Sequence, residues 1–430
     1  MKAPERSKQL PEDWQFKRLS SLANSYAGGT PDRSKPEYFH GDIPWVKSGE
    51  VNLRKIMQTE ERISELALSE SAAKIAESGS VLVAMYGATA GKVARLKIDA
   101  AINQAVLSIR TIGDELDNDF LFWVIESSAE KLLSMCQGAA QPNLSKGLID
   151  GLEIATPPLP EQKKIAAILT MVDDKLDVID RQIEAMQTIK LGLMQTLFSR
   201  GVGTQDATGR WVPRTEFKDS VLGAIPDEWQ VVQIQAISEV IRGASPRPQG
   251  DPRYYGGDVP RLMGADVTRD GKWVTPKIDS LTEEGAKLSR PCPKGTLTII
   301  CSGDVGVPSF LAVDACIHDG FLALINIDES LANKDYLYHI IYSVKQRFYT
   351  SATHGGVFTN LTTGILKEFL VPLPTLVEQQ KIASILDVAD EKISAAFRKR
   401  EYNESLKRGL MQKLLTGEWR VKLDNPSSAV

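Results

Sequence analysis

The stretch EQKKIAAILTMVDDKLDVIDRQIEAMQTIKLGLMQTLF at residues 161–198 returns, altered, as EQQKIASILDVADEKISAAFRKREYNESLKRGLMQKLL at residues 378–415. The two stretches align without a gap at an offset of 217. Nearly half of the aligned residues are identical, among them EQxKIAxIL at the start and GLMQ near the end. Two such matches at one offset do not arise readily by chance, so the chain contains an internal repeat.

The repeat extends upstream of both stretches. Pro11-Glu12-Asp13-Trp14 matches Pro226-Asp227-Glu228-Trp229, and YFHGDIP at 38–44 matches YYGGDVP at 254–260. Single residues also align: Gly79 with Gly295, Gly87 with Gly303, Gly138 with Gly355, and Asn143-Leu144 with Asn360-Leu361. The chain is therefore two copies of one unit, each a globular part of about 150 residues followed by a long helix.

The globular parts have the pattern of mixed α/β domains. Runs rich in β-branched and apolar residues predict strands at 79–86, 93–98, 105–110, 295–301, 309–313 and 321–327. Amphipathic patterns predict helices at 119–136 and 334–350. The globular parts differ from each other more than the long helices do. For example, YGATAGK at 86–92 aligns with CSGDVGV at 301–307. This indicates one shared role for the helices and two different targets for the globular parts.

Apolar residues in the long helices recur at alternating steps of four and three, which is the seam of a coiled coil. The first seam holds Ile165, Leu169, Val172, Leu176, Ile179, Ile183, Met186, Lys190, Leu193 and Leu197. The second holds Ile382, Leu386, Ala389, Ile393, Ala396, Arg400, Asn403, Lys407, Leu410 and Leu414. We expect the two helices of one chain to pair, because the repeat supplies both partners. The alternative is a dimerisation coiled coil between two chains.

Both helices are bounded by residues that start or stop helices. Prolines at 157, 158, 160, 372 and 374 precede them, and glycines at 201, 203 and 417 follow them. About 38 residues at 1.5 Å each make a rod of about 57 Å. If the second rod pairs with the first, it must run antiparallel to it. That arrangement places a globular part at each end and brings the C-terminus close to the N-terminus.

Composition bounds the class of protein. Of the 430 residues, 42% are apolar and 25% charged, as expected for a globular protein of several domains. No stretch is long and apolar enough for a membrane span, and the first residues lack an apolar signal core. The four cysteines form no C-x-x-C pair, which is typical of reduced thiols in a cytoplasmic protein. The net charge of −4 argues against a strongly basic surface for nucleic acid.

The order of several short motifs resembles the specificity subunits of Type I restriction-modification systems. These motifs are GGTP at 28–31, GDIPW at 41–45, GATAGK at 87–92, AINQ at 101–104, PPLPEQKKIAAIL at 157–169, FKDSVLGAIP at 217–226 and PLPTLVEQQKIASIL at 372–386. The resemblance covers nearly the whole chain in the order of the family. The second copy departs from it, because GGTP becomes GASP at 243–246 and GATAG becomes SGDVG at 302–306.

The resemblance implies an α+β chain with two mixed α/β target-recognition domains. A long antiparallel two-helix coiled coil separates them in a pseudo-twofold repeat. We expect the first domain at 1–156, the first spacer helix at 157–200, a linker at 201–225, the second domain at 226–371, the second helix at 372–418 and a tail at 419–430.

The family also implies partners and a division of labour. Each domain reads one half of a split, asymmetric site in double-stranded DNA. The helices set the spacer and dock two modification (methyltransferase) subunits, which carry S-adenosylmethionine and methylate adenine. Two restriction subunits using ATP and Mg can join them. We expect this chain to hold no cofactor and to bind DNA weakly without its partners.

Catalytic motifs are missing from the sequence. GATAGK has three residues between its glycines instead of four, and Val93 stands where a phosphate-binding loop needs Ser or Thr. The favoured interpretation is a tight strand-to-strand loop near DNA. The four histidines (His40, His318, His339, His354) share no metal-ligand spacing with the cysteines. The sequence therefore predicts neither a metal site nor an active site.

Candidate DNA contacts are basic, aromatic and small polar residues in loops, because arginine and lysine bind guanine edges and phosphates. In the first copy they are Arg33, Lys35, Lys47, Ser48, Tyr86, Thr89 and Lys92, with Tyr38 and Trp45 beside them. In the second copy they are Arg242, Arg247, Arg253, Tyr254, Arg261, Ser302, Asp304, His354 and Asn360, with Tyr255 beside them. Two rival readings remain: a protein-binding scaffold built on a coiled coil, and a self-sufficient methyltransferase or nuclease.

Overall fold

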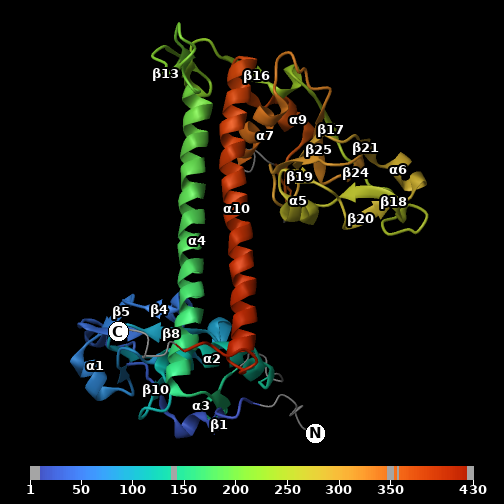
Figure 1. Ribbon diagram of the computed structural model, residues 1–430. Coiled ribbons are helices and arrows are strands. Elements are labelled where there is room, and N and C mark those ends of the chain that lie inside the picture. Colours follow the sequence, from blue (N-terminus) through green and yellow to red (C-terminus); the bar gives the residue numbers. More distant parts are fainter. Residues whose placement is uncertain (1–9, 137–142, 346–352, 356–357, 424–430) are drawn as a thin grey trace, which may run out of the picture. The chain divides into compact units, whose positions relative to one another are not determined.

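The structure is a computed structural model that describes residues 10–136, 143–345, 353–355 and 358–423. The chain forms two compact units, Met1–Arg181 with Arg398–Val430, and Gln182–Phe397. Two long helices, α4 (Leu159–Arg200) and α10 (Leu376–Leu414), contribute residues to both units (Figure 1). We call the globular part of the first unit the first head and that of the second unit the second head.

The first head contains a five-stranded and a four-stranded sheet, and a two-stranded pair that leads into α4. The five-stranded sheet has the order β2 (Ala23–Ala27), β10 (Val106–Thr111), β7 (Val81–Ala84), β8 (Val93–Leu96), β4 (Lys55–Ile56). The four-stranded sheet has the order β5 (Glu61–Ile63), β3 (Ile43–Val46), β9 (Ala100–Ile102), β6 (Lys74–Ala76). The pair is β1 (Gln15–Arg18) with β11 (Glu153–Thr156).

The second head repeats this topology strand for strand. Its five-stranded sheet has the order β17 (Glu239–Arg242), β25 (Phe321–Ile325), β22 (Leu297–Ile300), β23 (Pro308–Leu311), β19 (Trp273–Val274). Its four-stranded sheet has the order β20 (Asp279–Leu281), β18 (Tyr255–Leu262), β24 (Ala315–Ile317), β21 (Arg290–Cys292). The pair is β16 (Gln230–Gln233) with β28 (Leu370–Leu373). The internal repeat is thus a repeat of fold.

Short helices complete each head. The first head has α1 (Glu65–Glu70), α2 (Asn118–Ser134) and α3 (Lys146–Asp150). The second has α5 (Gly264–Asp270), α6 (Glu283–Leu288), α7 (Lys334–Ser343) and α9 (Thr363–Glu368). The linker forms two hairpins, β12 (Thr204–Gln205) with β13 (Trp211–Val212) and β14 (Phe217–Ser220) with β15 (Gly223–Pro226). The remaining strands, β26 (Thr353–Gly355) and β27 (Phe358–Asn360), pair with each other.

The predicted strands and helices are confirmed, although most of their ends differ from the predicted ones. The helix predicted at 119–136 is α2, which Asp117 caps by accepting from the backbone N–H groups of Asp119 and Phe120. The helix predicted at 334–350 begins where α7 begins, but α7 ends at Ser343 and residues 346–352 lie outside the described part. The aligned glycine at 138 also lies outside it.

Within each unit, the start of one long helix packs beside the end of the other. The core of the first unit contains Ile165 and Leu169 from α4 together with Leu414 from α10. The core of the second unit contains Ile382 and Leu386 from α10 with Met194 and Leu197 from α4. The helices of one chain therefore pair antiparallel in both units, and the expected intramolecular pairing is confirmed.

Every residue of the two predicted seams is buried or half-buried. The three basic seam residues meet carboxylates on the opposite helix. Lys190 binds Asp390 at 2.5 Å, Arg400 binds Asp180 at 2.5 Å, and Lys407 binds Asp173 at 2.7 Å. The sequence predicted the polar positions of the seams, but not these partners.

Candidate nucleic-acid interface

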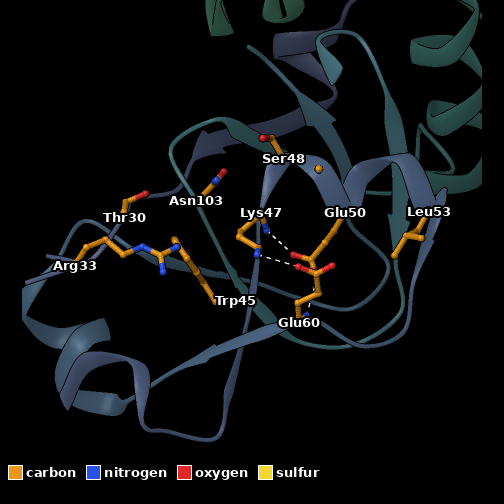
Figure 2. Close-up of a pocket in the computed structure, with 10 residues that line it drawn as sticks. Thr30, Arg33, Trp45, Lys47, Ser48, Glu50, Leu53, Glu60 and Asn103 are labelled. Carbon is orange, nitrogen blue, oxygen red and sulfur yellow. Dashed lines mark hydrogen bonds and ion pairs between the residues drawn. The ribbon is translucent and has the colours of Figure 1, made fainter. Parts of the chain in front are cut away.

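Three motifs that are distant in sequence meet at one pocket of the first head. Thr30 comes from GGTP after β2, Trp45 from GDIPW in β3, and Asn103 from AINQ after β9. They line an open pocket of about 500 Å³ together with Arg33, Lys47 and further residues, shown in Figure 2. Strand pairing explains the meeting, because β3 and β9 are parallel neighbours, with Trp45 opposite Ala101.

Trp45 forms an aromatic wall of this pocket. Its side chain is buried, and its indole Nε1 donates to the carbonyl oxygen of Gly29 at 3.3 Å. The guanidinium of Arg33 lies over two rings, 5.1 Å from the centre of Trp45 and 4.6 Å from the centre of Phe39. Stacking of this kind restricts a long, exposed side chain to a few orientations.

The two cations of the pocket are held by two adjacent glutamates. The ammonium of Lys47 donates to Glu60 Oε2 at 2.9 Å and to Glu61 Oε1 at 3.0 Å. Nη1 of Arg33 donates to Glu61 Oε2 at 2.8 Å. The hydrogen bonds that Lys47 donates to Glu60 and Glu61 raise its pKa. Burial alone would raise the pKa of Glu61. The hydrogen bonds from Lys47 and Arg33 outweigh the effect of burial, so the pKa of Glu61 is lowered.

A third carboxylate, Glu50, shapes the pocket from inside. Glu50 is 6% exposed, and its carboxylate accepts from the backbone N–H groups of Lys47 at 2.7 Å and Glu60 at 2.9 Å. It thereby joins the 3-10 helix that begins at Ser48 to the loop before β5. This role is structural, and it positions both Lys47 and Glu60.

Of the other candidates of the first head, Ser48 also lines this pocket, whereas Lys35, Tyr86, Thr89 and Lys92 do not. The ammonium of Lys35 donates to the hydroxyl of Tyr38 at 2.7 Å and pairs with Glu70 at 3.5 Å. Tyr86, which is 40% exposed, precedes the turn of Gly87–Thr89, and the exposed Lys92 follows it. This turn connects β7 to β8, so the prediction of a strand-to-strand loop is confirmed for residues 87–92.

The arginines of the second head are also engaged by acidic residues or main-chain carbonyls. Arg253 binds Asp251 through two nitrogens, Arg247 pairs with Asp319 at 3.7 Å, and Nε of Arg242 donates to the carbonyl oxygen of Asp319 at 3.0 Å. Arg253 also lies 5.2 Å from the ring centre of Tyr254.

Arg261 differs from its neighbours because it is buried. Only 5% of it is exposed, and it donates to Asp279 Oδ2 at 2.6 Å and to Ser245 Oγ at 3.0 Å. It therefore acts inside the domain and has almost no surface for a partner.

The remaining candidates surround the loop after β22. Ser302 forms a bridge with Asn360, and Asp304 pairs with Lys345 at 2.5 Å. His354 lies in β26, but its side chain is outside the described part.

The two heads carry a cation-binding carboxylate at the same sheet position. In the first head, Trp45 of β3 stands opposite Glu61 of β5. In the second, Arg261 of β18 stands opposite Asp279 of β20. Glu61 and Asp279 thus occupy equivalent positions and both bind a cation, although the cations come from different places in the chain.

Sequence reasoning missed the carboxylates of these sites. Glu60, Glu61 and Asp279 were not among the candidates, which were mainly basic, aromatic and small polar residues. The signal was present as a Glu-Glu pair about fifteen residues after Lys47, at the start of the edge strand β5 that pairs with β3.

The heads join their long helices through charged clusters. In the first unit, Arg54 pairs with Asp173 at 3.1 Å and with Glu126 at 2.6 Å. In the second, Lys272 pairs with Asp387 at 2.5 Å, and Nε2 of the buried His339 lies 2.8 Å from the same carboxylate. Burial lowers the pKa of His339 although Asp387 opposes this.

No group of three or more His, Cys, Asp or Glu side chains within the described residues is arranged to hold a metal ion. None of the helices in the described ranges is both long and apolar enough to cross a membrane. All four cysteines are free thiols.

The fold and the paired helices define a duplicated, two-headed protein of the specificity-subunit type. The family model of the Type I restriction modification DNA specificity domain matches residues 11–187 and 226–404, and the chain belongs to this family. It is a specificity subunit of a Type I restriction-modification enzyme and is not itself the catalytic chain.

Curated relatives span the same length. The putative type I restriction enzyme MjaX specificity subunit of Methanocaldococcus jannaschii is 26% identical over 432 residues, covering 96% of this chain and 95% of that protein. The MjaVIII specificity subunit of the same organism is 24% identical over 430 residues, with the same coverage. The crystal structure of a Type I restriction-modification S subunit from M. genitalium is 16% identical. It covers 96% of this chain and 98% of that one with a TM-score of 0.58, which supports the fold.

Proposed function

We propose that this chain selects an asymmetric, bipartite site in double-stranded DNA, with each head reading one half-site. The observation that carries the proposal is the duplicated head whose topology is repeated but whose loop residues differ. A repeated fold supplies the same docking geometry twice. Different loops, such as GATAG at 87–91 in one head and SGDVG at 302–306 in the other, give the two half-sites different sequences.

The helices serve as the spacer and as the dock for partners. At 1.5 Å per residue, the 42 residues of α4 extend about 63 Å, which exceeds the roughly 34 Å of one turn of DNA. Two modification subunits bind this part of the chain and supply S-adenosylmethionine for adenine methylation. Two restriction subunits using ATP and Mg complete a nuclease, and the complex acts in the cytoplasm on DNA.

The ion pairs of the heads favour weak DNA binding by the chain alone. Arg33, Lys47, Arg247 and Arg253 each have a carboxylate partner within 4 Å on their own head. A phosphate must compete with that carboxylate, so each contact contributes less than a free cation would. The partner subunits supply most of the sequence-independent affinity.

Methylome sequencing tests the proposal directly. The full chain is co-expressed with its modification subunit in a host without other adenine methyltransferases. One split motif methylated on adenine is expected. A double variant of the second head, Arg247→Ala with Arg253→Ala, should relax bases in one half-site only, and the other half-site serves as the internal control. If no split motif appears although the complex assembles, the proposal is wrong and the protein-binding scaffold is favoured.

A further inference from the structure

We propose that the pocket of Arg33 and Lys47 reads a guanine edge in the half-site of the first head, and that Glu60 and Glu61 are positioning residues for these two cations. This inference rests on the proposed function and goes beyond it, because it assigns a base class to one head. It also gives the carboxylates a role in specificity.

The charge of the pocket argues against a phosphate site. Two cations, Arg33 and Lys47, face three carboxylates from Glu50, Glu60 and Glu61. The set therefore carries no positive charge in excess, and a phosphate gains little from it. A neutral base edge does not need excess charge; it needs donors at fixed positions.

Both cations keep spare donors in fixed positions. Lys47 uses two N–H groups on Glu60 and Glu61, which leaves one of its three. Arg33 uses Nη1 on Glu61, and its plane is restricted by Trp45 and Phe39, which leaves further N–H groups. Guanine offers two acceptors, O6 and N7, in the major groove, and arginine and lysine are the side chains that match them best.

Neutral polar groups line the same pocket, as a base-reading site requires. Thr30, Ser48 and Asn103 face it beside the two cations (Figure 2). Hydroxyl and amide groups both donate and accept, so they also suit the amino donor of the cytosine that pairs with the guanine.

The second head supports the role of the carboxylates. Asp279 stands at the position of Glu61 and binds Arg261, with Ser245 as a further partner. Both heads thus hold a cation by a carboxylate of the edge strand. The cation in the first head is on the surface, whereas Arg261 is buried, so the guanine reading is assigned to the first head alone.

The first test removes a donor. In the complex with its modification subunit, Lys47→Ala should make one guanine position of the first half-site degenerate, with discrimination there falling roughly five- to hundredfold. The slope of log K for DNA binding against log salt should stay unchanged. Lys97→Ala, at an exposed lysine of the same head, is the matched control and should leave the motif intact.

Two outcomes of this test overturn the inference. If affinity falls equally for all sequences and the slope of log K against log salt drops by about one, Lys47 contacts phosphate. If the motif does not change, the pocket does not read DNA. The second half-site reports folding in the same experiment, because a misfolded chain would lose both halves.

The second test addresses positioning. Glu61→Gln frees Arg33 and leaves Lys47 with Glu60 alone, so binding to non-cognate DNA should rise about two- to fivefold, and the slope of log K against log salt should steepen by roughly one. Cognate discrimination should fall, and Glu61→Asp should restore part of it. Glu65→Gln, at the exposed start of α1, removes the same charge outside the pocket and should do neither.

The outcomes separate this inference from the proposed function. A wild-type complex that methylates no split motif would refute the function itself. A split motif without a guanine in the first half-site, or a Glu61→Gln variant indistinguishable from Glu65→Gln, refutes only the inference.

Discussion

The guanidinium of Arg214 and the carboxylate of Glu378 form a bidentate pair, with both N–O distances at 2.9 Å. Glu378 is 1% exposed and also accepts from the indole of Trp229 at 2.9 Å. The first unit repeats this arrangement, because Arg420 and Trp14 donate to the buried Glu161.

These two clusters explain why the motif EQ begins both long helices. Each buried glutamate lies at the start of one long helix and binds an arginine from the segment that follows the other. The adjacent glutamines are equally buried, and their side-chain amides donate to backbone carbonyl oxygens. Gln162 donates to those of Glu115 and Pro157. Gln379 donates to those of Leu331 and Pro374. The repeat thus encodes a closure of each unit. In the first unit, Arg420 also binds Asp13, which confirms the expected approach of the C-terminal segment to the N-terminal one.

Replacing the buried carboxylate should destabilise the second unit. Glu378→Gln removes the buried charge partner of Arg214 and leaves it only the exposed Glu228, which costs about 3 kcal/mol. The urea midpoint should fall accordingly. Glu228→Gln is the matched control, since Glu228 binds the same arginine at 3.2 Å from an exposed position. Its loss should cost less than 1 kcal/mol. Equal effects of the two substitutions would contradict a structural role for the buried pair.

A glycine next to this pair should tolerate no side chain. Gly201 has φ of 71°, and a Cβ there would lie 2.0 Å from Glu378 Oε1. Gly209 has φ of 80° but open space around it. Gly209→Ala should lower the free energy of unfolding by about 1 kcal/mol, which is the cost of a left-handed backbone at alanine. Gly201→Ala should lower it clearly more, because the new Cβ also meets the carboxylate of Glu378. Thermal unfolding of both variants measures the difference. A similar shift for both would mean that the pair moves aside freely.

How far the sequence predicts the fold depends on how local each signal is. The seam from Ile165 to Leu197 was predictable because heptads are a short-range pattern, and the repeat supplied its partner. The parallel pairing of β4 with β8 was not, since it joins residues about forty positions apart through backbone bonds that no side-chain pattern encodes.

The candidate site was predictable only in part. Arg33 and Lys47 were identified as basic loop residues, yet Arg261 has the same sequence context and is buried. Burial is decided by Asp279 and Ser245, which approach from other elements. Sequence motifs therefore located the pocket, whereas the partners of each cation required the structure.

Acid should weaken the joint between the first head and the helices. Burial alone would raise the pKa of Asp173, but Arg54 and Lys407 outweigh it and lower that pKa below its ordinary value of 3.8. A lowered folded-state pKa contributes stability above the unfolded pKa, and this stability is lost as the pH falls through the folded value. The contribution is therefore complete at pH 7 and pH 5 and declines below about pH 4.

Asp173→Asn tests this contribution. At pH 7 the variant should be less stable than the wild type by about 2 kcal/mol, because Lys407 and Arg54 lose their buried partner and keep only Glu126. The gap in the free energy of unfolding should be the same at pH 5 and should shrink below pH 4. Asp174→Asn, which removes a more exposed carboxylate next to it, is the control. A gap that stays constant down to pH 3 would show that Asp173 does not act through its charge.

A buried amide in the second seam should cost stability. Asn403 is 1% exposed, its Nδ2 donates to the carbonyl oxygen of Lys399 at 2.6 Å, and its Oδ1 has no hydrogen-bond partner. Asn403→Leu removes an unsatisfied polar atom and fills a seam position with an apolar group, so it should stabilise the chain by about 1 kcal/mol. Gln412→Leu, at an exposed position of the same helix, controls for helix propensity and should change the stability little.

The urea midpoint and the oligomeric state of the Asn403→Leu variant are measured together. A polar residue in a seam can fix register at a cost in stability. If Asn403→Leu instead lowers the midpoint or yields mixed oligomers, the amide sets the pairing of α4 with α10 and its cost is compensated.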